Sequence, residues 1–311
     1  MNYLLYAFFD PDGKIDFHVL ESLRKYSKFF KVVFISNKIL SLYEKKKIDF
    51  VEHIIESEHK EKDFGSWKLG IKYLKNKKVK SLVLTNDSII GPLNNLSKII
   101  TNMKKKDCDF WGISTAGKNN DFHIQSYFLF LKENVLNSQV FKSFFNKINR
   151  VESKAELVKL YEIGLTQKFL ESGFKCNSLL PHYDKDIHSS EQSILLIIEK
   201  KLPFLKVKNI VSNPFRIKRM VRVLNNLKDK KKYLNYIQRV NNSNDLSHLF
   251  YILPQFKHSL ISPKIIFFRA KFINNNKYWR FYIKLFGFFV FFIIIPVKSN
   301  FEKTYRSNRN Y

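Results

Sequence analysis

The sequence predicts an α/β protein whose core is a mostly parallel β-sheet flanked by helices. The first two-thirds of the chain alternates short apolar runs with longer segments of helical periodicity. This alternation is typical of βαβ units. Three of the apolar runs end abruptly in small polar residues, at residues 10, 36–37 and 86–88. Right-handed crossovers would bring these strand ends to one edge of the sheet.

Each predicted element follows from a local pattern. The predicted strands are aliphatic and aromatic runs bounded by charges or turn formers, and they cover residues 3–9, 31–35, 81–85, 109–113 and 125–130. The predicted helices carry apolar residues at helical spacing, and they cover residues 16–29, 38–47, 66–76, 93–105, 135–145 and 153–173. Gly173 suits the end of the last helix, because glycine often follows a helix directly.

Composition separates an N-terminal domain, predicted as residues 1–215, from a basic, aromatic-rich region of residues 216–311. Of the net charge of +28 on the 311 residues, +20 falls in residues 201–311, where 23 Lys and Arg face 3 Asp and Glu. A field of this sign attracts a polyanion, either a nucleic acid or an anionic membrane surface. Turn signals near residues 203 and 213 precede segments that we predict to be short basic helices.

An apolar block near the C-terminus is a second indication of a membrane. Residues 285–297 carry no charge, but a helix needs about 20 residues to span a bilayer. Basic and aromatic residues flank the block, which is typical of a segment that lies in the membrane surface or inserts shallowly. The alternatives are a buried core helix or strand, or a contact surface for another membrane protein.

Cysteine usage and the first residues bear on the cellular compartment. Cys108 and Cys176 share no motif, so they indicate neither a zinc site nor a disulfide framework. The first residues lack a basic region and a small-residue cleavage site, so they predict a strand and not a signal peptide. We therefore expect a cytoplasmic protein, peripherally associated with the inner face of the cytoplasmic membrane through residues 216–311.

Asn86-Asp87-Ser88 is the clearest candidate for chemistry, because it follows an apolar strand directly. Open α/β sheets bind ligands at the carboxyl ends of their parallel strands. One carboxylate between two small polar residues can hold a hard divalent cation while leaving positions open for phosphate. Asp87 is therefore a candidate metal ligand. The same residues are ordinary turn formers, so a simple turn is the alternative.

A second candidate segment opens the predicted helix at residues 63–70. Asp63 can cap this helix, and Gly65 allows a ligand to approach the backbone closely. Ser66 and Lys68 lie where the free N–H groups of a helix start can receive phosphate or a ribose hydroxyl. Many helices begin in this way and bind nothing.

Polar residues interrupt two further apolar runs, at Asp109-Phe110-Trp111 and around His123 and Gln125. Burying His123 or Gln125 without partners is costly, so these side chains either join a hydrogen-bonded network or face a cleft. Trp111 suits the core, although an aromatic ring beside a cleft can also stack on a sugar.

Glu162 lies near the top of an amphipathic helix. A carboxylate there can deprotonate an acceptor hydroxyl if it faces the cleft, and a solvated position on the helix surface is the alternative. The sequence contains no Walker A loop, Gly-x-Gly-x-x-Gly, Gly-x-Ser-x-Gly or His-Glu-x-x-His motif. This removes the commonest nucleotide-hydrolase, dinucleotide-binding and hydrolase classes.

Taken in order and spacing, six segments resemble the rhamnan synthesis protein F family, bacterial polysaccharide glycosyltransferases of the GT-A type. The segments are Ile35-Ser36-Asn37, Asp63-Phe64-Gly65-Ser66-Trp67-Lys68, Asn86-Asp87-Ser88 with Gly91-Pro92, Asp109-Phe110-Trp111-Gly112, His123-Ile124-Gln125-Ser126-Tyr127-Phe128 and Tyr161-Glu162-Ile163-Gly164-Leu165-Thr166. The resemblance covers roughly residues 1–215. The family usually has Gly-Tyr-Asp before Phe-Gly-Ser, whereas Glu61 and Lys62 precede Asp63 here.

The resemblance implies a GT-A-like (Rossmann-like) fold and the transfer of a sugar from a nucleotide-diphosphate donor. Rhamnose is the sugar at the level of the family, and the acceptor would be a lipid-linked glycan or a growing cell-surface polysaccharide. Asn86-Asp87-Ser88 takes the place of the Asp-x-Asp motif but has one carboxylate. We therefore expect weaker binding of Mg²⁺ or Mn²⁺, and metal independence stays open.

The resemblance also implies roles for individual residues. Asp87 and Glu162 would be catalytic, with Glu162 taking the proton of the acceptor hydroxyl. The donor would be held by Asp63, Gly65, Ser66, Lys68, Asn86, Asp87 and Ser88. The sugar or acceptor pocket would include Asp109, Trp111, His123 and Gln125.

Two other functions stay open at the level of sequence. A catalytically silent glycosyltransferase-like scaffold of a polysaccharide assembly complex fits the single carboxylate. A polyanion- or nucleic-acid-binding protein fits the charge but not the six segments. No aromatic-basic RNA motif or zinc finger is present, so we expect no nucleic-acid partner.

Overall fold

The computed structural model describes residues 1–249, apart from residues 219, 228 and 244, and the backbone of residues 267–268, 271–272, 278–285 and 288–296. The chain divides into two compact units, Met1–Leu253 and Pro254–Tyr311. Residues 216–249 of the basic region thus belong to the first unit.

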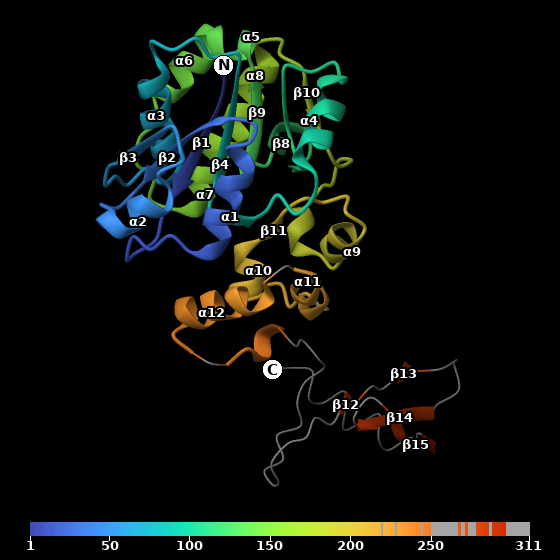
Figure 1. Ribbon diagram of the computed structural model, residues 1–311. Helices are drawn as coiled ribbons and strands as arrows, with labels where there is room; N and C mark the ends of the chain where they lie inside the picture. Colours follow the sequence, from blue (N-terminus) through green and yellow to red (C-terminus); the bar gives the residue numbers. More distant parts are fainter. Residues whose placement is uncertain are drawn as a thin grey trace. The chain divides into compact units, whose positions relative to one another are not determined.

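A seven-stranded sheet forms the centre of the first unit (Figure 1), with its strands in the order β10-β6-β9-β4-β1-β2-β3. Their bounds are β1 Asn2–Phe8, β2 Lys31–Ser36, β3 His53–Glu56, β4 Ser81–Asn86, β6 Phe110–Gly112, β9 Phe128–Lys132 and β10 Cys176–Ser178. Strand β9 is antiparallel to both of its neighbours, and the other six strands run parallel to one another. The predicted mostly parallel sheet is therefore confirmed.

The strand order creates a topological switch between β1 and β4. From β1 the chain moves to β2 and β3 on one side, and it then crosses back to β4 on the other side of β1. Open α/β sheets bind ligands outside the carboxyl ends of the strands at such a point. Phe9 follows β1 and Asp87 follows β4, so both residues lie at the switch.

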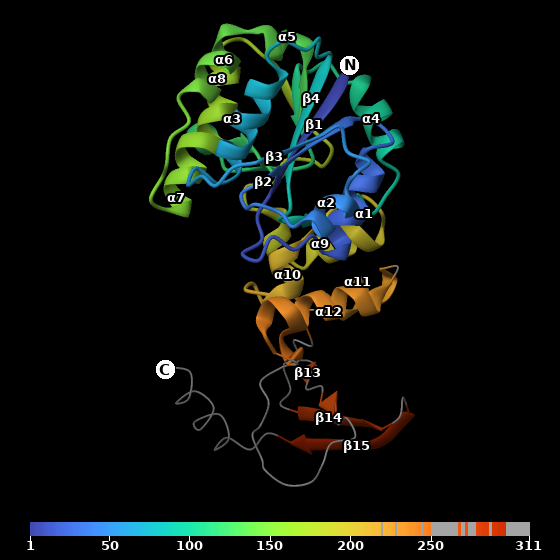
Figure 2. The ribbon, with the colours of Figure 1, turned by 60° about the vertical axis from the view of Figure 1, so that its left-hand side comes forward.

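Helices cover both faces of the sheet (Figure 2), which explains why the central strands are nearly continuous apolar runs. The helices are α1 Phe17–Tyr26 and α4 Leu96–Lys104 on one face, and α3 Lys62–Leu74, α6 Gln139–Asn146 and α8 Gly164–Glu171 on the other. On the first face, helices α1 and α4 contribute Leu23 and Met103 to the core. On the second face, helices α3, α6 and α8 contribute Trp67, Phe145 and Phe169.

Short elements complete the first unit. The remaining helices are α2 Leu42–Lys47, α5 Glu133–Asn137, α7 Lys154–Leu157, α9 Gln192–Ile198, α10 Val207–Val211, α11 Met220–Asn226 and α12 Lys230–Asn241. The short strands are β5 Ile89–Ile90, β7 Thr115–Ala116, β8 His123–Ile124 and β11 Leu205–Lys206. Within the described part of the chain, no helix is both long and apolar enough to cross a membrane.

Several element boundaries differ from the predicted ones. Helix α3 begins at Lys62 and its N-cap is Glu61, so the expectation that Asp63 caps this helix is wrong. The predicted helix of residues 153–173 consists of α7, a π-helical turn at Val158–Ile163 and α8. The predicted strand of residues 125–130 is β9, which begins later and is the reversed strand of the sheet.

The second unit is described through its strands. Strand β14 (Tyr278–Leu285) pairs antiparallel with β15 (Phe288–Pro296), and also with β12 (Phe267–Phe268) and β13 (Lys271–Phe272). The sequence predicts a helical basic region. This is confirmed for α11 and α12 and is wrong for the segments that form strands β12 to β15. The side chains of the apolar block 285–297 lie outside the described residues, and its membrane role stays a prediction.

Candidate functional site

Asp87 is fixed at the switch point by the backbone of β1. Its own N–H donates to the carbonyl oxygen of Ala7 at 3.2 Å, and the N–H of Phe9 donates to Asp87 Oδ2 at 2.7 Å. The ladder between β1 and β4 therefore continues one step beyond the end of β4. This step holds the carboxylate in place at the carboxyl edge of the sheet.

Asn86 connects the turn after β4 to the start of α3. Its Nδ2 donates to Oδ2 of Asp63 at 2.6 Å, and its Oδ1 accepts from the hydroxyl and the N–H of Ser88 at 2.6 and 3.2 Å. Asn86 is buried, and a buried amide needs such partners. The structure thus brings Asp63, Asn86, Asp87 and Ser88 together, although Asp63 is far from the other three residues in sequence.

Trp67 sets the position of α3 against this turn. Its side chain is 0% exposed, and its indole N–H donates to the carbonyl oxygen of Thr85 in β4 at 3.1 Å. Asp63 lies one turn earlier in the same helix, so the anchored tryptophan places the Asp63 carboxylate beside Asn86.

The carboxylates of this cluster have raised pKa values. Burial is the main cause: it raises the pKa of Asp87 to about 8, with a further rise from the charge of Asp63. Burial also raises the pKa of Asp63 to about 6, with a contribution from Glu162, against the hydrogen bond from Asn86. Carboxylates perturbed by burial and by one another are typical of functional sites, and a bound cation would offset their repulsion.

The cluster fits a divalent cation that also uses ligands from a substrate. Among the described residues, no group of three or more His, Cys, Asp or Glu is arranged to hold a metal ion. Mg²⁺ at nucleotide sites is usually held by one or two carboxylates together with substrate phosphates and water. Asp87 and Asp63 provide the two carboxylates that such a site needs.

Glu162 lies on the π-helical turn between α7 and α8. Such turns are rare and are found frequently at functional sites. The Glu162 side chain is half-buried, and its charge acts on both Asp63 and Lys206. Its neighbour Tyr161 anchors the turn, since the Tyr161 hydroxyl donates to the carbonyl oxygen of Asn149 at 2.7 Å. The charge of Glu162 therefore acts on the carboxylate cluster through Asp63.

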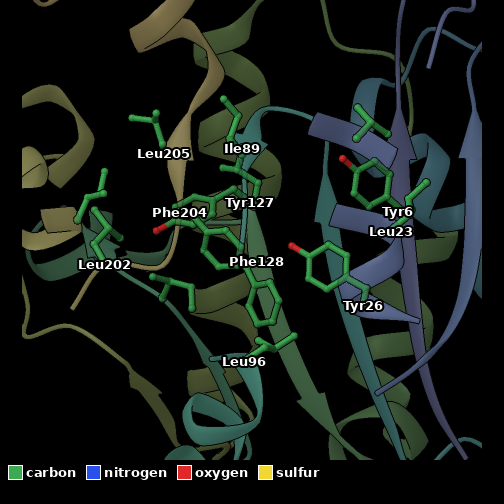
Figure 3. Close-up of a cluster of buried hydrophobic side chains, with 14 of the residues drawn as sticks. Tyr6, Leu23, Tyr26, Ile89, Leu96, Tyr127, Phe128, Leu202, Phe204 and Leu205 are labelled. Atoms are coloured by element: carbon green, nitrogen blue, oxygen red, sulfur yellow. The ribbon is translucent and has the colours of Figure 1, made fainter. Parts of the chain in front are cut away.

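A second wall of the site comes from Asp186, His188 and residues 203–208, which belong to none of the six segments found in the sequence. Strand β11 pairs with β5 so that Lys206 lies opposite Ile89, and the N–H of Val207 donates to the carbonyl oxygen of Ser88 at 2.9 Å. Figure 3 shows the segment before Lys206 packed beside Tyr127 and Phe128 through Phe204. The only sequence signal for this wall is the turn at Pro203, which precedes the short run of β11.

Gln125 joins a polar network behind this wall, as one of its two sequence alternatives predicts. Ser114 Oγ donates to Gln125 Oε1 at 2.7 Å and lies 2.6 Å from the hydroxyl of Tyr127. The Gln125 side chain also forms a hydrogen bond with Asp186. The N–H of His188 donates to Asp186 Oδ1 at 2.9 Å, so the network fixes the turn that leads into the second wall.

His123 lines an open hollow of about 570 Å³ next to the π-helical turn. Its Nδ1 lies 2.7 Å from the carbonyl oxygen of Asp121. The hollow mixes charged and apolar groups, and its lining includes Asp121, His123, Lys154, Val158, Lys159 and Ile163.

Three of the predicted donor-binding residues have structural partners instead. A Cβ at Gly65 would lie 2.7 Å from His59 Nδ1, so the space that a ligand would use is filled by His59. Ser66 Oγ lies 2.9 Å from His59 Nε2. Lys68 Nζ donates to the carbonyl oxygen of Ile148 at 2.9 Å. The structure therefore does not bring these three residues to the Asp87 cluster.

Two of the predicted pocket residues lie elsewhere. Asp109 precedes β6, so it lies at the opposite edge of the sheet from Asp87, and its carboxylate accepts from Asn134 Nδ2 at 2.6 Å and from the N–H of Lys175 at 2.7 Å. Trp111 is 1% exposed and stacks on Phe130 in the core, with ring centroids 5.0 Å apart. Both positions support the sheet and do not line the site.

The fold and the site define an α/β protein with a carboxylate cluster at the switch point of its sheet. The family model of rhamnan synthesis protein F matches residues 32–277. The chain therefore belongs to the rhamnan synthesis protein F family.

Two relatives match about half of the chain. The y4gN protein of Sinorhizobium fredii is 28% identical in an alignment of 177 residues that covers 55% of this chain and 46% of that protein. The virulence protein VirA of Vibrio anguillarum is 23% identical in an alignment of 196 residues that covers 51% of this chain and 62% of that protein. The chain thus spans less than two-thirds of the length of either relative.

Solved structures show more distant similarity. Core-mannan synthase A from Aspergillus fumigatus, in a form with Mn and GDP, is 8% identical with a TM-score of 0.37, covering 59% of this chain and 72% of that one. A cytidylyltransferase from Leptospira borgpetersenii is 13% identical with a TM-score of 0.31, covering 59% of this chain and 76% of that one.

Proposed function

We propose that this protein is a glycosyltransferase that moves a sugar from a nucleoside-diphosphate donor to a saccharide acceptor. The observation that carries the proposal is the position of Asp87 at the β1–β4 switch, next to Asn86, which donates to Asp63. The charge of Glu162 acts on Asp63. Membership of the rhamnan synthesis protein F family supports this function. The sheet with its single reversed strand is consistent with a GT-A-like fold.

In the proposed reaction an acceptor hydroxyl attacks the anomeric carbon of the donor sugar. The new bond joins the acceptor oxygen to this carbon, and the bond to the diphosphate oxygen breaks. Glu162 takes the proton of the acceptor hydroxyl, and the nucleoside diphosphate leaves with the electron pair. A divalent cation held by Asp87 and Asp63 would supply positive charge to this leaving group.

The surrounding residues shape the binding of the two substrates in this proposal. The hollow lined by His123 and Lys154 lies beside the turn that carries Glu162, so we assign it to the acceptor saccharide. Gln125 holds the second wall in place through Asp186. The family name favours rhamnose as the sugar and a cell-surface polysaccharide as the product. The net charge of +20 in residues 201–311 favours an acceptor at an anionic membrane.

Binding of nucleoside diphosphates tests the proposal. We expect one of UDP, GDP, CDP and dTDP to bind in isothermal titration calorimetry with Mn²⁺ present, and Asp87→Ala to weaken its binding about tenfold or more. Asp107→Ala is the matched control, because Asp107 is exposed and pairs with Lys175, next to Asp109 at the opposite edge of the sheet. If no nucleoside diphosphate binds, or if Asp87→Ala binds as tightly as the wild type, the proposal is wrong.

A catalytically silent scaffold is the second candidate function. It is favoured by the pKa of about 8 at Asp87, because this carboxyl group is mostly neutral at pH 7 unless a cation binds. A scaffold of this kind would release no nucleoside diphosphate from any nucleotide sugar. Turnover of one nucleotide sugar would exclude it.

A further inference from the structure

Three lysines from separate elements converge on the second wall of the site. They are Lys154 at the start of α7, Lys206 in β11 and Lys208 in α10. The charges of Lys154 and Lys208 act on Lys206, and the charge of Lys154 acts on Lys208. Gathering like charges in a partly buried place is unfavourable, and a bound anion would offset the repulsion.

Lys206 is the best placed of the three for a ligand at the switch point. The pairing of β11 with β5 fixes its backbone opposite Ile89, next to Ser88. Its Nζ lies 4.2 Å from the centre of the Tyr127 ring, and Tyr127 is itself held by Ser114. The ammonium group is therefore positioned by a strand and by a buried ring, unlike an exposed lysine on a flexible stem.

Carboxylates lie near these three lysines. The charges of Asp186 and Glu162 act on Lys206, and Lys206 in turn acts on Asp63. Lys208 Nζ lies 3.8 Å from Asp186 Oδ2. The lysines therefore have counter-charges in the free protein, and a phosphate group would add to or replace them.

Behind the lysines lies a buried histidine with unused polar atoms. His188 is 0% exposed and packs edge-on against Tyr127 at 5.1 Å. Among the described residues, neither of its ring nitrogens has a hydrogen-bond partner. A buried polar group without a partner is costly. The two ring nitrogens of His188 are therefore polar atoms of this wall that have no hydrogen-bond partner among the described residues.

We propose that Lys206, flanked by Lys154 and Lys208, binds the diphosphate of the nucleotide-sugar donor and stabilises the charge that develops on the leaving group. This inference rests on the proposed glycosyltransferase function and deepens it. The Asp-x-Asp position of this chain provides one carboxylate, at Asp87. Lys206, whose charge acts on Asp63, would supply charge to the diphosphate in addition to any cation that Asp87 and Asp63 hold.

Calorimetry on the full chain tests the assignment with Lys206→Gln, Lys206→Arg and the control Lys201→Gln. Lys201 is exposed, at 64%, and pairs with Glu199. Each variant is titrated with the member of the UDP, GDP, CDP and dTDP panel that the wild type binds, and with the corresponding nucleoside, which lacks phosphate. A thermal unfolding curve verifies that each variant is folded.

We expect Lys206→Gln to weaken binding of the nucleoside diphosphate about tenfold or more, the typical effect of losing a hydrogen bond to a charged group. Its affinity for the nucleoside stays that of the wild type. Lys206→Arg retains most of the affinity, and Lys201→Gln retains all of it. The triple variant Lys154→Gln, Lys206→Gln, Lys208→Gln binds the nucleoside diphosphate more weakly still. Its affinity for the nucleoside is that of the wild type.

Equal binding of the nucleoside diphosphate by Lys206→Gln and the wild type would overturn the assignment and leave the proposed function intact. A parallel loss of nucleoside affinity would also overturn it, because the effect would then be a general distortion of the site. If the wild type binds no nucleoside diphosphate, the proposed function fails and this assignment fails with it.

Discussion

At the scale of single residues, burial gives Asp87 a strongly raised pKa. Its pKa rises from an ordinary value of 3.8 to about 8, mainly through burial and then through the charge of Asp63. The folded state therefore holds this proton more tightly than the unfolded state does. As the pH rises from about 4 to about 8, the unfolded chain loses the proton first, and the free energy of unfolding falls.

Asp87→Asn removes this titration and should stabilise the protein. We expect the variant and the wild type to unfold at similar temperatures near pH 4. The difference should grow in favour of the variant as the pH rises, and it should level off above about pH 8. Thermal unfolding at pH 4, 6 and 8 measures the effect, with Asp107→Asn as a control at an exposed position. A difference that shrinks with rising pH would contradict the raised pKa.

Site residues that lie in a recognisable motif could be predicted from the sequence. Site residues whose position depends on the pairing of distant segments could not. Asp87 and Asp63 belong to motifs with a physical meaning, so they could be named in advance. The resemblance also implies a pocket role for Asp109, but this residue precedes its strand and lies at the other edge. No local pattern identifies Lys206, because its position depends on the pairing of β11 with β5.

At the scale of elements, α12 is tied to the carboxyl edge of the sheet by one arginine. Arg239 Nη2 donates to Oδ2 of Asp10 at 2.8 Å and to Oδ2 of Asp16. The three side chains are 23%, 11% and 13% exposed. Asp10 closes the turn after β1, so this ion pair joins the basic region to the strand that holds Asp87.

Arg239→Gln should destabilise the first unit, because it leaves two poorly exposed carboxylates without their cation. Breaking a buried ion pair costs about 3 kcal/mol or more, which for a unit of this size lowers the unfolding temperature by roughly 6 °C or more. Thermal unfolding at pH 7 provides the measurement. Arg222→Gln, at an exposed position of α11, should change it little. An unchanged unfolding temperature for Arg239→Gln would show that α12 is held by its apolar contacts alone.

The order and type of the main elements could also be predicted from sequence, but some details could not. Residues 153–173 have one continuous helical pattern, and hydrophobic spacing does not reveal a π-helical turn within it. Strand β9 has the composition of any buried strand, so its reversed direction comes only from its pairing with β4 and β6. Strands β3 and β5 are too short to give a clear pattern.

At the scale of the whole molecule, part of the positive charge lies next to the carboxylate cluster. The charge is concentrated in residues 201–311, of which residues up to 249 pack in the first unit with the sheet. Lys206 and Arg239 belong to this basic stretch, and both contact the edge of the sheet where Asp87 lies. Part of this basic stretch therefore packs within the first unit, beside the turns that follow β1 and β4.

Release of nucleoside diphosphate from nucleotide sugars, in the presence of Mn²⁺ and a saccharide acceptor, tests the proposed glycosyltransferase function. The wild type should release it from one donor, and Glu162→Gln should release it at least about 100-fold more slowly while binding the nucleotide with unchanged affinity. Glu171→Gln, an exposed position at the end of α8, should behave as the wild type. Release at the same rate by Glu162→Gln, or no release from any donor by the wild type, would contradict the account.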